Sequence, residues 1–369
     1  MTRSVLELFC ELAAIPSPPG SERAVADVVA RYLRDCGLDV DEDATGPETG
    51  SEIGNLFARL PATGDGEPLL FCAHLDTVPP TAAIEPVVDD GFVRNAAGTI
   101  LGADNKAAVA VMLEAARSLL AENCPHGGVE LLFTPKEEVG LIGAYAFDHR
   151  RLESRVGFVY DQAAPIGTVI TGAPSAHAMT FTFHGRAAHA GMHPEDGRSA
   201  IAAAARAIAE LRLGQVDPDS TANVGTIAGG TAMNIVPEWC SMTAEARSHD
   251  EERLAVLVQE MQDAVTFAAG VAECEATTDI RRTYRGYRFA RGDRPVALAA
   301  EALARCGYEP VYERSGGAAD ANVFNERGLE VVNLANGMID IHTPDERIAV
   351  ADLDAMVEVT LALVEAARR

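Results

Sequence analysis

LLFCAHLDTV, residues 69–78, is the stretch from which the fold can be worked out. Its apolar half, Leu69 to Ala73, predicts a buried strand that ends close to His74 and Asp76. These two side chains share one face of an extended chain, because side chains alternate along a strand. A histidine and a carboxylate at the carboxyl end of a core strand lie where open α/β sheets place their chemistry. On this stretch alone, a turn histidine beside a capping aspartate explains the pattern equally well.

The composition is that of a folded, acidic protein. The chain has 369 residues, 48% of them hydrophobic, which is enough for one large domain or two ordinary ones. Its net charge of −25 repels phosphate backbones, so we expect no nucleic-acid partner; the charge either serves solubility or suits a carboxylate-lined cation site. The seven cysteines form no C-x-x-C pair, which predicts free thiols in a reducing compartment. Because no signal peptide or apolar span is apparent, we expect a cytoplasmic protein that binds no membrane.

Hydrophobic patterns divide the chain into an α/β part and an inserted α+β part. In the first part, predicted strands and helices alternate, and acidic residues follow the strands at 129–133 and 157–160. From residue 175 the predicted order is strand, helix, strand, strand, helix, strand, which describes a compact two-layer unit. We therefore predict one larger domain built from 1–174 and 285–369, interrupted by an inserted domain at 175–284.

Five strand or loop ends carry residues that can bind metal. They are His74, Asp104, the pair Glu137 and Glu138, Asp161 and His342. Two histidines and three carboxylates, one of them shared, suit two zinc ions roughly 3.5–4 Å apart. Each residue alone has a simpler explanation: His342 as a loop residue, Asp104 as a helix N-cap, and the glutamate pair as a solvated turn. Side chains of neighbours diverge, so one glutamate can bind metal while the other stays free as a general base.

Eight motifs follow one another along nearly the whole chain: HLDTVPP, TILGADNKAAVA, FTPKEEVGLIGA, GRAAHAGMHPEDGRSAI, GGTAMNIVPE, EARS, SGGAADAN and IHTPDE. Together they resemble the di-zinc aminopeptidase/aminoacylase/carboxypeptidase G metallopeptidase family, and most of all its peptidase T-like branch. The resemblance implies a three-layer αβα zinc-peptidase-like catalytic domain, interrupted by a ferredoxin-like lid domain through which the protein forms a homodimer. It also implies a metal-dependent exopeptidase with two Zn²⁺ per chain, although Mn²⁺ or Co²⁺ would accept the same ligands.

Carried onto this sequence, the resemblance implies five metal ligands. One group contains His74, Asp104 and Asp161, and the other contains Glu138 and His342 and shares Asp104. An aspartate at position 161 goes with the dipeptidase and tripeptidase branches, which favours cleavage of short peptides from the amino end. Asn105 departs from the pattern, since relatives commonly have a second aspartate there. The lost negative charge predicts weaker metal binding or altered hydrogen bonding.

The resemblance also implies three residues that act beside the metals. Asp76 would orient His74, and Glu137 would be the general base and later the general acid. His189 would reach into the partner subunit's site and help to stabilise the oxyanion.

Substrate contacts are implied at four further positions. Asn234 and Arg247 would hold the substrate, Arg247 by a two-pronged grip on a carboxylate, and Gly316 and Gly317 would let the backbone approach it. The alternatives are that Asn234 is a turn residue, that Arg247 forms a cross-strand ion pair, and that the two glycines belong to an ordinary loop. Ala319 stands where relatives often have serine or threonine, and the lost hydroxyl affects the expected substrate recognition.

Three functions are compatible with these residues. The main prediction is a di-zinc aminopeptidase or tripeptidase acting on short peptides. The alternative enzyme is an amidohydrolase that deacylates N-acyl amino acids. A binding protein that keeps the scaffold without turnover is the third, and the intact Glu137 argues against it, since a protein without catalysis needs no free base beside a metal.

Overall fold

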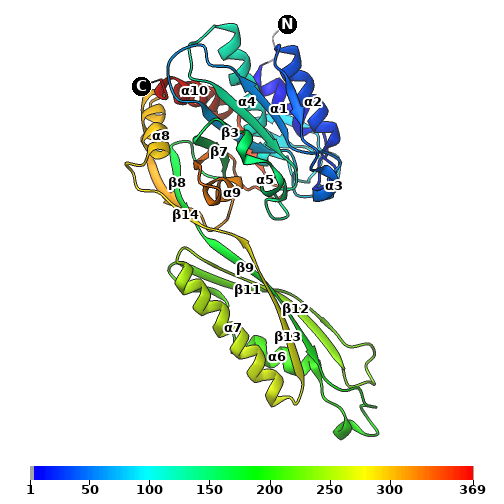
Figure 1. Cartoon of the computed structure of the whole chain (residues 1–369). Coiled ribbons are helices and arrows are strands. Elements are labelled where there is room, and N and C mark those ends of the chain that lie inside the picture. The colour runs from blue at the N-terminus through cyan, green and yellow to red at the C-terminus, as the bar shows by residue number, and fades with distance from the viewer. Residues whose placement is uncertain (1–3, 369) are drawn as a thin grey trace. The chain divides into compact units, whose positions relative to one another are not determined.

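The computed structural model describes residues 4–368 (Figure 1). The chain forms two compact units. The first runs to Gly172 and resumes at Arg288, and the second comprises Ala173–Tyr287. Within the part of the chain that the structure describes, no helix is both long and apolar enough to cross a membrane.

A mixed sheet of nine strands, counted over residues 4–368, forms the centre of the first unit. The strands are β1 (Val40–Glu42), β2 (Leu56–Leu60), β3 (Leu69–His74), β6 (Val129–Thr134), β7 (Val156–Gln162), β8 (Thr168–Ala173), β14 (Tyr287–Arg288), β15 (Val311–Arg314) and β16 (Glu330–Ala335). Four neighbours, β6, β3, β7 and β16, run parallel to one another. Their carboxyl ends therefore meet at one edge of the sheet, where the predicted ligands follow them.

Helices cover both faces of this sheet. One face carries α1 (Val5–Ala13), α2 (Arg23–Asp35), α4 (Ala103–Ala121), α8 (Arg294–Arg305) and α10 (Val350–Ala366), and the other carries α5 (Ile142–Ala146), α9 (Asp320–Glu326) and the short α3 (Gly46–Thr49). Phe71 of β3 belongs to the core shared with α4. The Sγ atom of its neighbour Cys72 lies 3.6 Å from Oδ2 of Asp320 in α9. Since successive side chains of a strand point to opposite faces, the two helices lie on opposite sides. This αβα arrangement confirms the predicted fold class of the larger domain.

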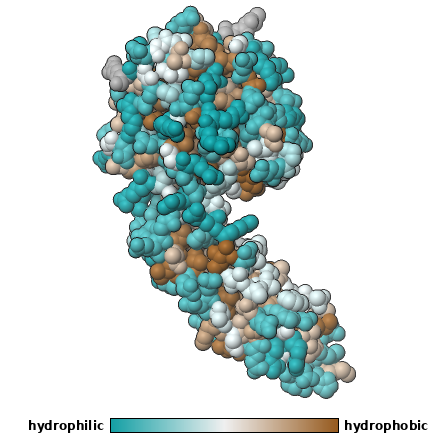
Figure 2. All heavy atoms as spheres, viewed as in Figure 1, coloured by the Kyte–Doolittle hydropathy of each residue, from teal (hydrophilic) through white to brown (hydrophobic). Residues whose placement is uncertain are grey.

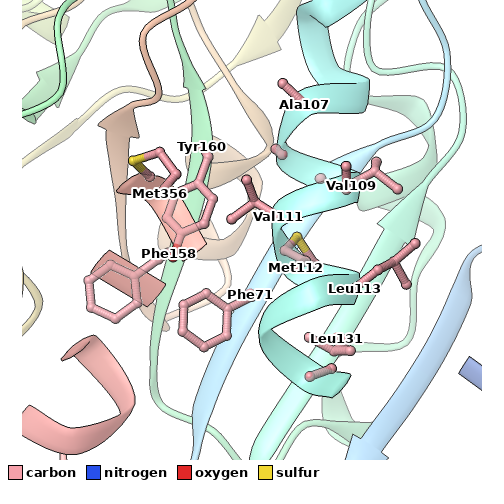
Figure 3. Packing of buried hydrophobic residues seen from close by; sticks show 14 of the residues in the cluster. Phe71, Ala107, Val109, Val111, Met112, Leu113, Leu131, Phe158, Tyr160 and Met356 are labelled. Atoms are coloured by element: carbon pink, nitrogen blue, oxygen red, sulfur yellow. The ribbon is translucent and has the colours of Figure 1, made fainter. Parts of the chain in front are cut away.

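The core between the sheet and α4 is closely packed. Figure 3 shows Val111 of α4 pointing toward the rings of Phe71 and Tyr160, with Phe158 on the far side of Phe71. The ring centroids of Phe71 and Phe158 are 5.7 Å apart, and those of Phe71 and Tyr160 are 6.0 Å apart. All four side chains are buried, which explains why α4 is apolar on nearly every side. A small sheet of β4 (Pro86–Asp89), β5 (Phe92–Asn95) and β17 (Arg347–Ala349) completes the unit.

The second unit is an antiparallel sheet with two helices. Its strands lie in the order β10 (Gly214–Asp217), β11 (Ser220–Gly229), β12 (Trp239–Ser248), β9 (Ser175–His184) and β13 (Glu275–Tyr284). The helices α6 (Ala200–Glu210) and α7 (Glu251–Val271) pack on one face of it (Figure 1). Apart from β10, both the chain order and the spatial order are those of the predicted ferredoxin-like unit, which is confirmed. β10 was not predicted, because four residues are too few to give a periodic signal.

Candidate metal centre

His74 and Asp104 meet at the carboxyl edge of the sheet. His74 is the last residue of β3, and its Nε2 lies 3.1 Å from Oδ1 of Asp104 at the start of α4. The regular helix begins only after Asp104 and Asn105, whose backbone angles are not helical (φ −81°, ψ 104° and φ −119°, ψ 25°). The Asp104 carboxylate is turned toward both histidines, because His342 Nε2 lies 3.1 Å from its other oxygen. These histidine contacts favour a site residue over a helix cap.

Two groups of candidate ligands form around Asp104. His74, Asp104 and Asp161 make up one group, and Asp104, Glu138 and His342 make up the other, with the ligand atoms of each group within 4.8 Å of one another. His74 Nε2 lies 3.7 Å from Asp161 Oδ1, and His342 Nε2 lies 3.1 Å from Glu138 Oε1. These groups have the composition that the resemblance implied. Their role as metal ligands stays a prediction.

The electrostatics of these groups are dominated by carboxylates. Burial, together with the charge of Asp104, raises the pKa of Asp161 to about 7. Hydrogen bonds to Asp104 and Glu138 raise the pKa of His342 to about 10. Hydrogen bonds to Asp104 and Asp161 also raise the pKa of His74, against a burial effect that works in the opposite direction. Buried carboxylates that repel one another, together with two histidines, are a donor set that fits divalent cations.

Asp76 supports the site differently from what was expected. The ring nitrogen His74 Nδ1 donates to the main-chain carbonyl oxygen of Asp76 at 2.8 Å, while the nearest carboxylate oxygen is 3.5 Å away. The fully buried carboxylate of Asp76 accepts instead from the main-chain N–H of Glu137 at 2.9 Å and of Glu138 at 3.1 Å. Its side chain therefore fixes the turn that carries the adjacent glutamates. Burial and the charge of Asp161 raise the pKa of Glu137 well above its usual value.

Two buried carboxylates at the centre were missed by sequence reasoning. Asp320 accepts a 2.6 Å hydrogen bond from Thr134 Oγ1, and burial raises its pKa to about 6. Glu346 accepts from three main-chain N–H groups of residues 101–104. Both belong to the motifs SGGAADAN and IHTPDE, so motif membership was the only signal available. Lys106 is also buried, donates to the carbonyl oxygen of Ile15, and has a pKa lowered by burial to about 7.

The two departures from the family have different surroundings. Asn105 is fully buried, and within residues 4–368 neither polar atom of its side-chain amide has a hydrogen-bond partner. Ala319 is the N-cap of α9, a position where serine and threonine are preferred because their hydroxyl accepts from the first helical turn. The serine or threonine that the resemblance leads us to expect at position 319 therefore has a helix-capping explanation that does not involve substrate.

Gly316 and Gly317 lie in the loop before α9. A Cβ at Gly316 would meet nothing within 4 Å, and one at Gly317 would meet only Ser315 Oγ at 3.8 Å, among the described residues. Open space is therefore available beside both glycines. Their contact with substrate stays a prediction.

The remaining predicted residues belong to the second unit. His189 is exposed and is paired with Ile235, while Asn234 is the next residue of that segment and accepts from the main-chain N–H of Ala190. Arg247 of β12 is paired with Glu245 of the same strand, through Nε at 3.1 Å and Nη2 at 2.9 Å. This ion pair runs along the strand, and contact of Arg247 with substrate stays a prediction.

Comparison with known proteins covers both units. A family model described as a peptidase dimerisation domain matches residues 171–273, and one described as peptidase family M28 matches residues 55–170. YqjE of Bacillus subtilis strain 168 is 38% identical over 367 residues, which are 100% of this chain and 99% of that protein. The solved structure of aminopeptidase PepT from Bacillus cereus has a TM-score of 0.90 and 38% identity, covering 99% of this chain and 98% of its own. A tripeptidase structure from Staphylococcus aureus has a TM-score of 0.94 and 34% identity, with coverage of 99% and 98%.

Proposed function

We propose that this chain, which belongs to the peptidase T-like branch of the di-zinc aminopeptidase/aminoacylase/carboxypeptidase G metallopeptidase family, removes amino-terminal residues from short peptides with the help of two zinc ions. It is a metal-dependent exopeptidase. We further propose that the substrates are short peptides, that the ions are zinc, that the site residues act as described below and that the protein is cytoplasmic.

The observation that supports the proposal best is the shared carboxylate. Asp104 stands between two histidines at 3.1 Å from each, and each histidine has a further carboxylate within 3.7 Å. Two such groups with one common ligand would hold two divalent ions side by side. Bound there, the ions would polarise the scissile carbonyl and lower the pKa of the attacking water.

Glu137 is the residue assigned to proton transfer. Its neighbour Glu138 is turned toward His342, and both main-chain N–H groups are held by Asp76, so the direction of the turn is fixed. A Glu137 oxygen would take a proton from the attacking water and return it to the leaving amine nitrogen.

His189 has the tautomer that oxyanion stabilisation requires. Its Nδ1 accepts from the main-chain N–H groups of Gly191 and Met192, each at 3.2 Å. A nitrogen that accepts carries no proton, so the proton of the neutral ring resides on Nε2. Nε2–H is therefore available to donate to a developing oxyanion in the site of a partner subunit.

Dimer formation through the second unit is part of the proposal. Residues 223–229 of β11 pair with β12 on one side, whereas β10 pairs with β11 only over residues 220–222. Within the described chain, the other edge of residues 223–229 is thus left open for a strand of a second copy. Figure 2 shows apolar side chains on the surface of this unit, and exposed examples are Ile227 and Met233.

The proposed function is tested by metal content and peptide cleavage. We expect about two zinc ions per chain, hydrolysis of a free-amine tripeptide, loss of activity on chelation, and recovery on adding Zn²⁺. Glu137→Gln should keep both ions and lose about 10²–10⁴-fold in kcat. Glu48→Gln, at an exposed glutamate of the same unit, should behave as the parent chain. Cleavage of N-acyl amino acids but not of tripeptides would replace the peptidase proposal by the deacylase alternative.

A further inference from the structure

Glu346 is a buried carboxylate that accepts three short hydrogen bonds, all from one main-chain segment. It is 2% exposed. Its Oε2 accepts from the N–H groups of Leu101 at 2.7 Å and Gly102 at 2.8 Å, and its Oε1 accepts from the N–H of Asp104 at 3.0 Å. These donors precede or begin α4, where main-chain N–H groups have no partner inside the helix. Glu346 therefore satisfies the segment that presents the shared Asp104 carboxylate.

The same glutamate belongs to the loop that carries His342. The loop is closed by two main-chain hydrogen bonds between Ile339 and Arg347, of 3.0 and 3.1 Å. Within it, the N–H of Glu346 donates to the carbonyl oxygen of Thr343 at 3.2 Å. His342 and Glu346 share one closed loop. The main-chain segment that Glu346 binds, residues 101–104, is therefore held at a fixed position relative to His342.

We infer that Glu346 is a positioning residue that sets the separation of Asp104 and His342, and through it the affinity for the metal ion held by Asp104, Glu138 and His342. The inference rests on the proposed function. Asp104 and His342 are 238 positions apart in the sequence, and their direct contact is one 3.1 Å pair of atoms that a bound ion would replace. The three hydrogen bonds of Glu346 would remain when an ion is bound, so they would keep Asp104 and His342 at a fixed separation.

A carboxylate suits this position better than an amide. Three N–H donors reach two oxygens, and each bond is charge-assisted. In Glu346→Gln the side chain keeps its size but replaces one acceptor oxygen by an NH₂ group that faces an N–H donor. The loop of His342 would then shift away from Asp104, whose contact with His74 leaves the other group in place. Loss of such a supporting contact lowers metal affinity by about 10- to 100-fold.

The test is a competition titration of the metal-free protein with Zn²⁺ against a chromophoric chelator, which yields two dissociation constants. We expect Glu346→Gln to raise one of them by about 10- to 100-fold and the other by less than about threefold. His342→Ala removes the affected group, so adding Glu346→Gln to that variant should leave the remaining dissociation constant within about threefold. Glu346→Asp, which keeps the charge but is one methylene shorter, should recover part of the affinity and serves as the test if Glu346→Gln does not fold.

A matched control separates positioning from stability. Glu130 is 1% exposed and also accepts from two main-chain N–H groups, those of Glu153 at 3.1 Å and Ser154 at 2.9 Å. Glu130→Gln should lower the unfolding midpoint but leave both zinc dissociation constants unchanged. Parent-like zinc affinities in Glu346→Gln, or equal weakening by Glu130→Gln, would overturn the inference. If the parent chain itself fails to bind two ions, the proposed function fails instead, so the two failures are distinguishable.

Discussion

Asp76→Asn separates two ways in which residue 76 supports the metal centre. His74 is oriented by the main-chain carbonyl of Asp76, which the substitution leaves in place. The carboxylate holds the N–H groups of Glu137 and Glu138, one on each oxygen, and this contact changes. Asparagine offers one acceptor oxygen and one NH₂ group, so one of the two N–H donors loses its partner and faces another donor.

The size of the effect follows from these two hydrogen bonds. A bond to a charged, buried acceptor contributes about 1.5–3 kcal/mol, and a buried N–H left without a partner costs about 1–3 kcal/mol. Because Asp76 is fully buried, we expect the metal-free variant to lose about 2–4 kcal/mol of unfolding free energy. Displacement of Glu138 should in addition weaken zinc binding by about 10- to 100-fold. The group containing His74 should be affected less.

Urea unfolding of the metal-free protein and a chelator competition titration measure these two effects. Asp43→Asn is the matched control, because Asp43 Oδ1 also accepts two main-chain N–H groups, those of Thr45 at 3.1 Å and Asn55 at 2.9 Å. It should lower stability without changing zinc affinity. If Asp76→Asn binds zinc as tightly as the parent chain, the carboxylate does not position the glutamate turn and the reasoning is refuted.

Three further changes test other parts of the structure. Burial lowers the pKa of His126 below the value near 6.5 of an unfolded chain, so the unfolded state binds its proton first and stability falls as pH drops below about 6.5. His126→Asn can keep an acceptor for the N–H of Gly128, and its urea midpoint should fall less between pH 7.5 and pH 5.5 than that of the parent chain. An equal fall in both proteins would contradict this assignment. Ala319→Ser should raise the unfolding free energy by about 1 kcal/mol by capping α9 and leave KM for a tripeptide unchanged, whereas a changed KM would favour a substrate contact. Phe158→Ala, which removes a fully buried ring, should cost about 3–5 kcal/mol in urea unfolding, and a smaller loss would mean that the surrounding core closes the space.

The fold could be predicted because its signals are local and repeated. The buried strand at 69–74 ends at His74 as the apolar run predicts, and the strand–helix alternation gives the layers of the first unit. The order of elements in 175–284 was enough to identify the ferredoxin-like unit. Two strands were missed: β10 has only four residues, and β8 at Thr168–Ala173 takes its conformation from pairing with the distant strands β15 and β16.

The candidate ligands could be found because they lie at or after the ends of elements: His74 and Asp161 near the ends of β3 and β7, Asp104 at the start of α4, and Glu138 and His342 in the loops after β6 and β16. How they are supported could not be found in this way. A main-chain N–H group is the same at every residue, so a carboxylate that accepts from it leaves no pattern of residue types. For this reason Glu346 was missed, and Asp76 was paired with the imidazole of His74, whereas its carboxylate accepts from the turn at Glu137.

The three buried carboxylates Glu22, Asp76 and Glu346 share one task. Each accepts main-chain N–H groups beside the candidate ligands: Glu22 from Lys136, which precedes the two adjacent glutamates, Asp76 from Glu137 and Glu138, and Glu346 from the start of α4. Charge-assisted bonds make these loops rigid, but they add buried negative charge around ligands that are themselves carboxylates. Divalent cations would offset that repulsion, and a ligand that binds only the folded state stabilises it. The rigidity of the loops and the affinity for metal therefore have a common origin, and the metal-free protein is expected to unfold at lower urea concentration than the zinc-bound protein.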